Sequence, residues 1–94
     1  MSRRADVEAA LRHLAPLVPD FEAGAILDHA QDSPGLQSAT PENAAWLAMT
    51  AFIRHRMTDY DSLLAEGYDA DSARFFVAEA MQEILESWGA RRSL

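Results

Sequence analysis

Apolar residues recur at helical spacing along most of the chain, and this pattern predicts helices rather than strands. The first helix is expected over about residues 5–15, the second over about 21–31, and a fifth over about 70–88. The inward-facing positions are expected to be Val7, Ala10, Leu11 and Leu14 in the first helix, Ala23, Ile26, Leu27 and Ala30 in the second, and Ala73, Val77, Ala80, Met81, Ile84 and Trp88 in the fifth.

A third helix, expected from residue 41 to about 57, is apolar nearly all round. Thr40 is its expected N-cap and Pro41 takes the first helical position, which is a clear start signal. Its polar strip is expected to consist only of Asn43, Thr50 and Arg54. Such a helix must be covered by the other helices or by a second subunit, so we expect it to be central.

The remaining helix boundaries follow from glycines and from residues that cap helix starts. Gly67 is expected to end a short fourth helix in the left-handed conformation, and Gly89 is the expected C-cap of the fifth. The expected N-caps are Asp20 for the second helix, Thr58 or Asp59 for the fourth, and Asp69 or Asp71 for the fifth. A chain of 94 residues has room for one core. The sequence therefore predicts an all-α, compact single domain over residues 1–94, with four to five helices and a central apolar helix.

The composition narrows the function mainly by exclusion. The chain has no cysteine and no lysine, which excludes disulfides, thiol catalysis, cysteine-based metal sites and lysine-dependent phosphate loops. Eight basic and fifteen acidic residues give a net charge of −7, which argues against broad nucleic-acid binding. No catalytic sequence signature is present, so a non-enzymatic role is favoured, although the sequence does not exclude an enzyme. No cofactor is expected.

The cellular location of the protein is predicted from the hydropathy and charge of its sequence. The longest near-apolar run, residues 44–53, is too short for a membrane span, which needs about 20 residues. Asp6 and Glu8 stand where a signal peptide would need an apolar stretch. We therefore expect a cytoplasmic protein that has no membrane partner.

A polar string at the end of the third helix holds the best candidates for chemistry. Arg54 and His55 stand where the helix dipole favours cations, and Tyr60 and Asp61 follow directly after the turn. In one interpretation His55 transfers a proton or binds a ligand, and Asp61 or Tyr60 orients it. The alternative is a helix cap with surface ion pairs, each worth roughly 0–1 kcal/mol.

The histidines provide no strong metal signal. His13, His29 and His55 include no pair at the spacing that places two side chains on one helix face. A metal site would need histidines from three helices together with a carboxylate such as Asp28 or Asp61. Nothing in the sequence requires this arrangement, so no metal ligand is assigned.

Aromatic residues on the fifth helix are candidates for an interface. Phe75 shares a helix face with Glu79, Gln82 and Glu86, which is the polar face, whereas Phe76 lies at the expected edge of the core. A single exposed aromatic residue is common, but it can also anchor a partner. Tyr68 is a further aromatic residue close to this helix in the sequence. We take Phe75, Phe76 and Trp88 as candidate interface residues for a protein partner or a second copy of the chain.

A nucleic-acid function is a weaker alternative. Short helices around Gly67 followed by a longer helix could form a helix-turn-helix. The basic pairs Arg3-Arg4 and Arg91-Arg92 are terminal and are expected to be mobile. The recognition helix would be negatively charged, because Arg74 is opposed by Asp71, Glu79, Glu83 and Glu86. This charge opposes docking against phosphates, so no nucleic-acid partner is expected.

Part of the chain resembles a known family. The string Ile53-Arg54-His55, followed by Thr58, Tyr60-Asp61, Leu63-Leu64, Gly67 and Ala73-Arg74, resembles the signature of the bacterial and fungal family called domain of unknown function 2293. Ile26-Leu27-Asp28-His29-Ala30 and Trp88 also resemble its pattern, and the likeness covers about residues 23–88. That pattern often has a second histidine where this chain has Phe52, and the difference argues against a His-pair metal site. The resemblance implies a small helical domain with no assigned activity.

Two functional hypotheses follow. The first is a non-enzymatic domain for protein–protein interaction or self-association, suggested by the aromatic residues and the apolar central helix. The second is a small-ligand or metal-binding site, conceivably hydrolytic, formed by Arg54, His55, Tyr60 and Asp61.

Overall fold

The computed structural model describes residues 2–94. Its helices are α1 (Arg3–Leu14), α2 (Asp20–Asp32), α3 (Pro41–Met57), α4 (Tyr60–Ala65) and α5 (Ala70–Ser87), with a short 3₁₀ helix, η1 (Pro34–Leu36), between α2 and α3. No strand occurs in residues 2–94. The predicted all-α fold is therefore confirmed, and the expected helix ranges differ from the observed ones by two residues or fewer.

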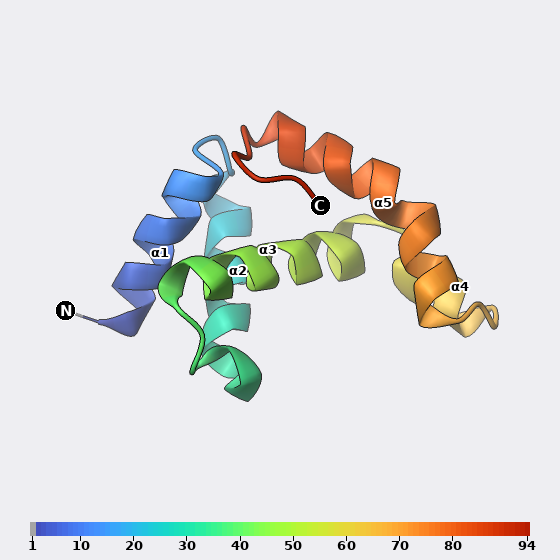
Figure 1. The fold of residues 1–94 in the computed structure, drawn as a ribbon, viewed down its shortest axis with the longest axis horizontal. Coiled ribbons are helices and arrows are strands. Elements are labelled where there is room, and N and C mark those ends of the chain that lie inside the picture. The colour runs from blue at the N-terminus through green and yellow to red at the C-terminus, as the bar shows by residue number, and fades with distance from the viewer. Residues whose placement is uncertain (1) are drawn as a thin grey trace.

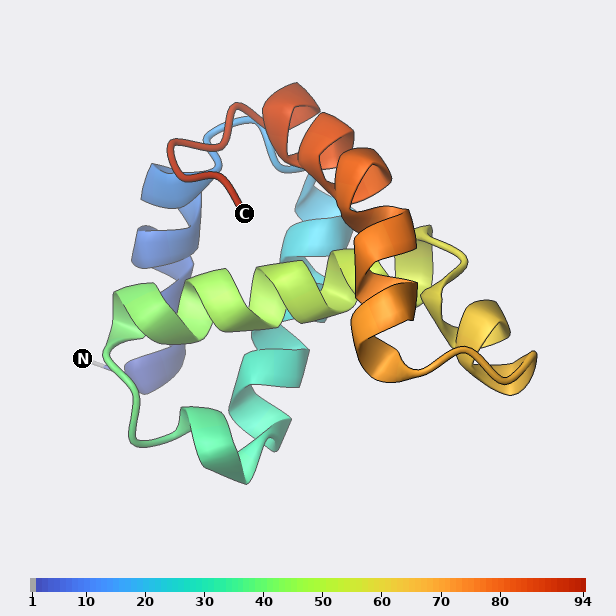
Figure 2. The ribbon, with the colours of Figure 1, turned by 45° about the vertical axis from the view of Figure 1, so that its right-hand side comes forward.

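The predicted central position of α3 is also confirmed. This helix runs through the middle of the molecule and contacts every other helix (Figure 1). Helices α1 and α2 lie across one part of it, while α5 covers it from another direction and α4 lies near its C-terminal end (Figure 2). The buried residues of α3 are Ala44, Ala45, Trp46, Ala48, Met49, Thr50 and Ile53.

Side-chain caps start several of the helices. The Thr40 hydroxyl accepts a hydrogen bond from the Asn43 N–H at 3.2 Å, as the sequence predicts. Asp69 caps α5 by accepting from the Ser72 N–H at 2.8 Å. Ser2 caps α1, which consequently begins two residues earlier than expected.

The expected cap at Asp20 is wrong. Pro19 is the N-cap of α2 and makes no side-chain capping bond. Asp20 is already the first helical residue, and its carboxylate accepts a hydrogen bond from the Arg12 guanidinium at 3.0 Å. An ion pair between α1 and α2 therefore takes the side chain that local sequence assigns to a cap.

The two predicted glycine terminations are both present. Gly67 has a φ of 103° and Gly89 a φ of 70°, so both adopt the left-handed region that favours glycine. Before α4, the Thr58 hydroxyl accepts from the Tyr60 N–H at 3.2 Å, whereas the N-cap residue Asp59 makes no side-chain capping bond.

Two details of the predicted burial are wrong. Thr50 is buried, and its hydroxyl donates to the Leu47 carbonyl at 3.2 Å, while Leu47 itself is partly exposed on the outer side of α3. On α5, Ala80 is exposed and Leu85 is fully buried. The buried stripe of α5 advances in steps of four residues and so rotates away from Ala80 toward Leu85.

The C-terminal segment closes the fold. The Leu17 N–H donates to the Trp88 carbonyl and the Arg91 N–H donates to the Leu14 carbonyl, each at 2.9 Å. The chain then returns over the start of α3, where the Arg92 guanidinium lies 4.6 Å from the Trp46 ring centroid. This return is visible as the red segment in Figure 1. Within residues 2–94, no helix has the length and apolarity needed to cross a membrane.

Candidate functional site

The turn between α3 and α4 brings the predicted polar residues together. His55 lies in the last turn of α3 and Asp61 in the first turn of α4. The His55 Nδ1 and an Asp61 carboxylate oxygen are 2.7 Å apart. The contact is possible because α3 ends at Met57 and α4 begins at Tyr60, which folds the two side chains back across the turn.

Tyr60 is the buried centre of this group. Its side chain is 6% exposed, and its ring meets the His55 imidazole edge to face at 5.2 Å between centroids. The Arg54 guanidinium lies 5.7 Å from the same ring, within cation–π range. The Arg54 Nε is buried and has no hydrogen-bond partner among residues 2–94. Arg54, His55, Tyr60 and Asp61 therefore form one cluster, which we call the polar junction.

The polar junction has the geometry of an oriented histidine. With its hydrogen on Nδ1, the imidazole donates to Asp61, and the Nε2 atom is left to accept or donate a proton elsewhere. Asp61 thus sets the tautomer and the direction of the ring. Both side chains are about half exposed, at 46% for His55 and 63% for Asp61. The ion pair itself is consequently worth only about 0–1 kcal/mol to stability.

A second cluster consists of exposed aromatic rings at the start of α5. Phe75 is 78% exposed, Phe76 58% and Tyr68 46%. The Phe76 ring meets Tyr68 at 5.5 Å and Phe75 at 5.8 Å, both edge to face. We call these three residues the aromatic face.

Trp88 does not belong to this face. It is only 5% exposed, because the end of α5 packs against the loop between α1 and α2. The expectation that Trp88 offers a surface to a partner is therefore wrong, whereas its predicted place in the buried stripe of α5 is confirmed.

The aromatic face lies in the most acidic part of the chain. Residues 57–87 contain a single basic side chain, Arg74, and eight acidic ones: Asp59, Asp61, Glu66, Asp69, Asp71, Glu79, Glu83 and Glu86. Arg74 donates to the Asp71 carboxylate at 2.6 Å, and this bond raises the pKa of Arg74. The hydrogen bond from the Ser72 N–H lowers the pKa of Asp69 below its ordinary value. The aromatic face thus belongs to a segment in which acidic side chains far outnumber basic ones.

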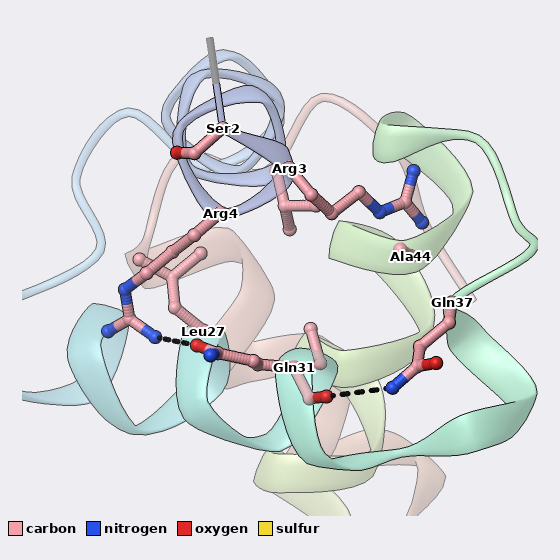
Figure 3. A pocket seen from close by; sticks show the side chains of 9 residues that line it. Ser2, Arg3, Arg4, Leu27, Gln31, Gln37 and Ala44 are labelled. Carbon is pink, nitrogen blue, oxygen red and sulfur yellow. Dashed lines mark hydrogen bonds between the residues drawn. The ribbon is translucent and has the colours of Figure 1, made fainter.

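A cavity of about 530 Å³ lies where α1, α2 and α3 meet (Figure 3). Its floor is apolar, and its rim carries the guanidinium groups of Arg3 and Arg4. Arg3 donates to the Leu36 carbonyl at 2.9 Å and to the Ala39 carbonyl at 2.5 Å. Arg4 donates to the Asp28 carboxylate and to the Gln31 side-chain oxygen, each at 2.9 Å. Both cations are therefore bound to protein acceptors. These bonds contradict the expectation that the pair Arg3-Arg4 is mobile, and no sequence pattern predicts the cavity.

The remaining histidines do not join the polar junction. His13 is an exposed residue of α1, and His29 is an exposed residue of α2. Among the described residues, no group of three or more histidine, cysteine, aspartate or glutamate side chains is placed to hold a metal ion.

Comparison with known proteins gives one family. The model of a family described as "Uncharacterized conserved protein (DUF2293)" matches residues 10–89. The match begins earlier than the resemblance expected from residue 23, and it includes the second half of α1 as well as the polar junction and the aromatic face. No curated protein and no solved structure matched the chain. Because the family model covers most of its length, the chain belongs to the family of uncharacterized conserved proteins DUF2293.

Proposed function

We propose that this domain binds another protein through its aromatic face. The observation that carries the proposal is the exposure of three rings, of which Phe76 contacts the other two and Phe75 is 78% exposed. A side chain this exposed stabilises its own fold very little. Burying aromatic rings against a partner removes a large apolar area from water, and such residues are frequent anchors in interfaces.

The acidic side chains of the segment that holds the aromatic face favour a partner with basic residues. The part of the chain that holds the aromatic face carries eight acidic side chains and one arginine, and that arginine is already paired. A second copy would bring a surface of the same sign against it, which opposes self-association through this face. The favoured partner is a protein segment with apolar anchors flanked by lysine or arginine.

A peptide-library selection tests this partner chemistry. Peptides retained by the wild-type domain are expected to combine aromatic or aliphatic residues with basic ones. Phe75→Ala and Phe76→Ala are each expected to weaken their binding by about 30-fold, the size of a typical hot-spot loss of about 2 kcal/mol. Phe21→Ala is the matched control, because Phe21 is 81% exposed on α2 and takes part in none of the ring pairs found in residues 2–94.

Sedimentation equilibrium over a hundredfold concentration range separates a protein partner from a second copy. A monomer at all concentrations supports the proposal. A dimer that dissociates in Phe75→Glu would assign the aromatic face to self-association instead. Retained peptides that bind Phe75→Ala and Phe76→Ala as well as they bind the wild type would refute the use of this face. The proposal includes the expected cytoplasmic location, which cell fractionation tests.

A small-ligand site at the polar junction is the second candidate function. It is favoured by the 2.7 Å contact that orients the His55 ring and by the Arg54 Nε without a partner. Its test is NMR titration of the His55 imidazole signals with small anions and divalent metals. Ring signals that shift with one of these compounds, and lose that response in Asp61→Asn, would support it. Ring signals that stay unchanged with every compound would exclude it.

A further inference from the structure

A second hollow of about 210 Å³ opens between α2 and α3. Ala25 and His29 line it from α2, and the residues from α3 are Ala51, Phe52, His55 and Arg56. His29 and His55 are far apart in the sequence, and the packing of α2 on α3 places both at this hollow. We call it the histidine pocket.

The polar side chains that line the histidine pocket all carry nitrogen groups. Its polar side chains are two imidazoles and one guanidinium, and no carboxylate is among the residues that line it. This composition is unusual in a chain with a net charge of −7. All three groups can donate hydrogen bonds to an anion, and Arg56 is always protonated. A guanidinium beside the two imidazoles repels a metal cation and attracts an oxyanion.

The two donors from α3 are held in place by their neighbours. The Asp61 carboxylate accepts from the Nδ1–H of His55, so the Nε2 atom donates to a bound anion when the imidazole carries both protons. The Arg56 guanidinium lies 5.9 Å from the centroid of the Phe52 ring, within cation–π range. These contacts reduce the side-chain entropy that a ligand would otherwise have to remove.

The remaining wall sets the size and character of the ligand. Ala25, Ala51 and Phe52 offer small apolar surfaces beside the basic groups. The volume is below the roughly 300–1,000 Å³ of ordinary ligand pockets, so only a small molecule fits. A suitable ligand has one oxyanion for the nitrogen groups and a short apolar body for the wall.

We propose that the histidine pocket binds a small organic oxyanion, a carboxylate or a phosphate monoester. His29, His55 and Arg56 contact its oxygen atoms, and Phe52 packs against its apolar part. This inference rests on the second candidate function, because His55 belongs to both the pocket and the polar junction. It adds His29 and Arg56, which lie outside the junction, as the residues that decide where the ligand sits.

NMR titration of the full chain with phenyl phosphate, benzoate and inorganic phosphate tests the proposal. At least one of the two organic anions is expected to shift the signals of both His29 and His55, and to bind more tightly than inorganic phosphate. Phenyl phosphate or benzoate as the tighter ligand identifies the headgroup as phosphate or carboxylate. His29→Asn and Arg56→Gln are each expected to weaken binding about tenfold, as expected for a lost hydrogen bond to a charged group.

His13→Asn and Arg91→Gln are the matched controls, because both residues are exposed and lie outside the pocket. They are expected to leave binding unchanged, and an equal loss in them would show unspecific attraction of anions and overturn the proposal. A different result would be wild-type affinity in His29→Asn and Arg56→Gln together with weaker binding in Asp61→Asn. It would show that the anion binds at the polar junction, and it would overturn the proposal that the histidine pocket binds it. Absence of binding by both organic anions would overturn it as well. All of these substitutions are at exposed positions, so each variant is expected to fold.

Discussion

The first three helices and the last two use their charged side chains differently. Residues 2–56 contain seven acidic side chains and five arginines. Three of those arginines connect separate elements: Arg3 reaches the segment after α2, Arg4 reaches α2, and Arg12 binds Asp20. In residues 57–87 the single arginine pairs only with Asp71, three residues away in its own helix. The first region therefore joins its elements through three arginines, whereas the arginine of the second stays within α5 and Asp61 links α4 to α3 through His55.

Helices α3 and α5 also differ in how they bury their apolar side chains. The side chains of α3 that face α1 and α2 are buried, and Met49 and Ile53 are completely inaccessible. Helix α5 buries a narrow stripe and leaves Phe75 and Phe76 exposed near its start. Both halves leave single apolar side chains in water, such as Phe21 on α2, but the exposed rings that contact one another lie in the second half. The four predictions below test how far the two halves differ.

The largest expected effects come from the core of each half. Leu11→Ala in α1 and Leu85→Ala in α5 each remove a fully buried side chain. Each is expected to lower the free energy of unfolding by about 2–5 kcal/mol. Urea denaturation followed by circular dichroism and by tryptophan fluorescence measures the loss. Both probes should report one transition. Two separate transitions in Leu85→Ala would show that α5 unfolds independently of α1–α3.

A smaller effect is expected where the two halves are joined. Gly89 has a φ of 70°, and a Cβ there would lie 3.4 Å from the Leu17 side chain. Gly89→Ala is expected to cost about 1 kcal/mol or more, because alanine disfavours this backbone conformation. Gly24→Ala is the control: Gly24 lies within α2, and a Cβ there meets nothing within 4 Å. That change should stabilise the fold by about 0.5–1 kcal/mol. Equal effects of the two substitutions would contradict the interpretation of Gly89.

The acidic half should respond to pH through the cap of α5. The hydrogen bond from Ser72 lowers the pKa of Asp69 in the folded protein. Its contribution to stability is therefore fully present above the unfolded pKa of about 4 and is lost as the pH falls through the lower folded pKa. Asp69→Asn should reduce the dependence of stability on pH in this range. Carbon-detected NMR titration measures the Asp69 pKa directly, and a value at or above that of an unfolded aspartate would contradict the cap.

The smallest effect is expected at the aromatic face. Phe75→Ala should change the free energy of unfolding by no more than about 0.5 kcal/mol, because most of the ring is already in water. Thermal denaturation measures this change, with Phe21→Ala as the control at another exposed phenylalanine. A loss of more than about 1 kcal/mol would mean that Phe75 supports the fold, and the contrast between the two halves would then be weaker.

Local signals were sufficient for most of the fold. Thr40 and Pro41 mark the start of α3 correctly, and Gly67 and Gly89 mark helix ends, because a cap or a left-handed residue is decided by its nearest neighbours. The prediction for Asp20 was wrong because Arg12, on a different helix, competes for its carboxylate. Boundaries were therefore predictable wherever no distant partner intervened.

The candidate sites were predictable only in part. The gathering of His55, Tyr60 and Asp61 follows from a short turn, and the exposure of Phe75 follows from its helix face. The burial of Trp88 at the end of α5 depends on the loop between α1 and α2, which lies near the other end of the sequence. That His29 and His55 line one pocket depends likewise on how α2 packs on α3. Periodicity shows which face of a helix is apolar, but not which residue of another helix lies against it.

The two backbone bonds that join the C-terminal segment to the end of α1 and to the loop after it also bear on how the chain folds. Leu17 with Trp88 and Leu14 with Arg91 join residues near opposite ends of the chain. Closing so long a loop costs more entropy than pairing helices that lie closer together in the sequence, such as α1 with α2 and α2 with α3. We therefore expect these bonds to form after the rate-limiting step of folding. Substitutions at this closure should chiefly accelerate unfolding and leave the folding rate nearly unchanged.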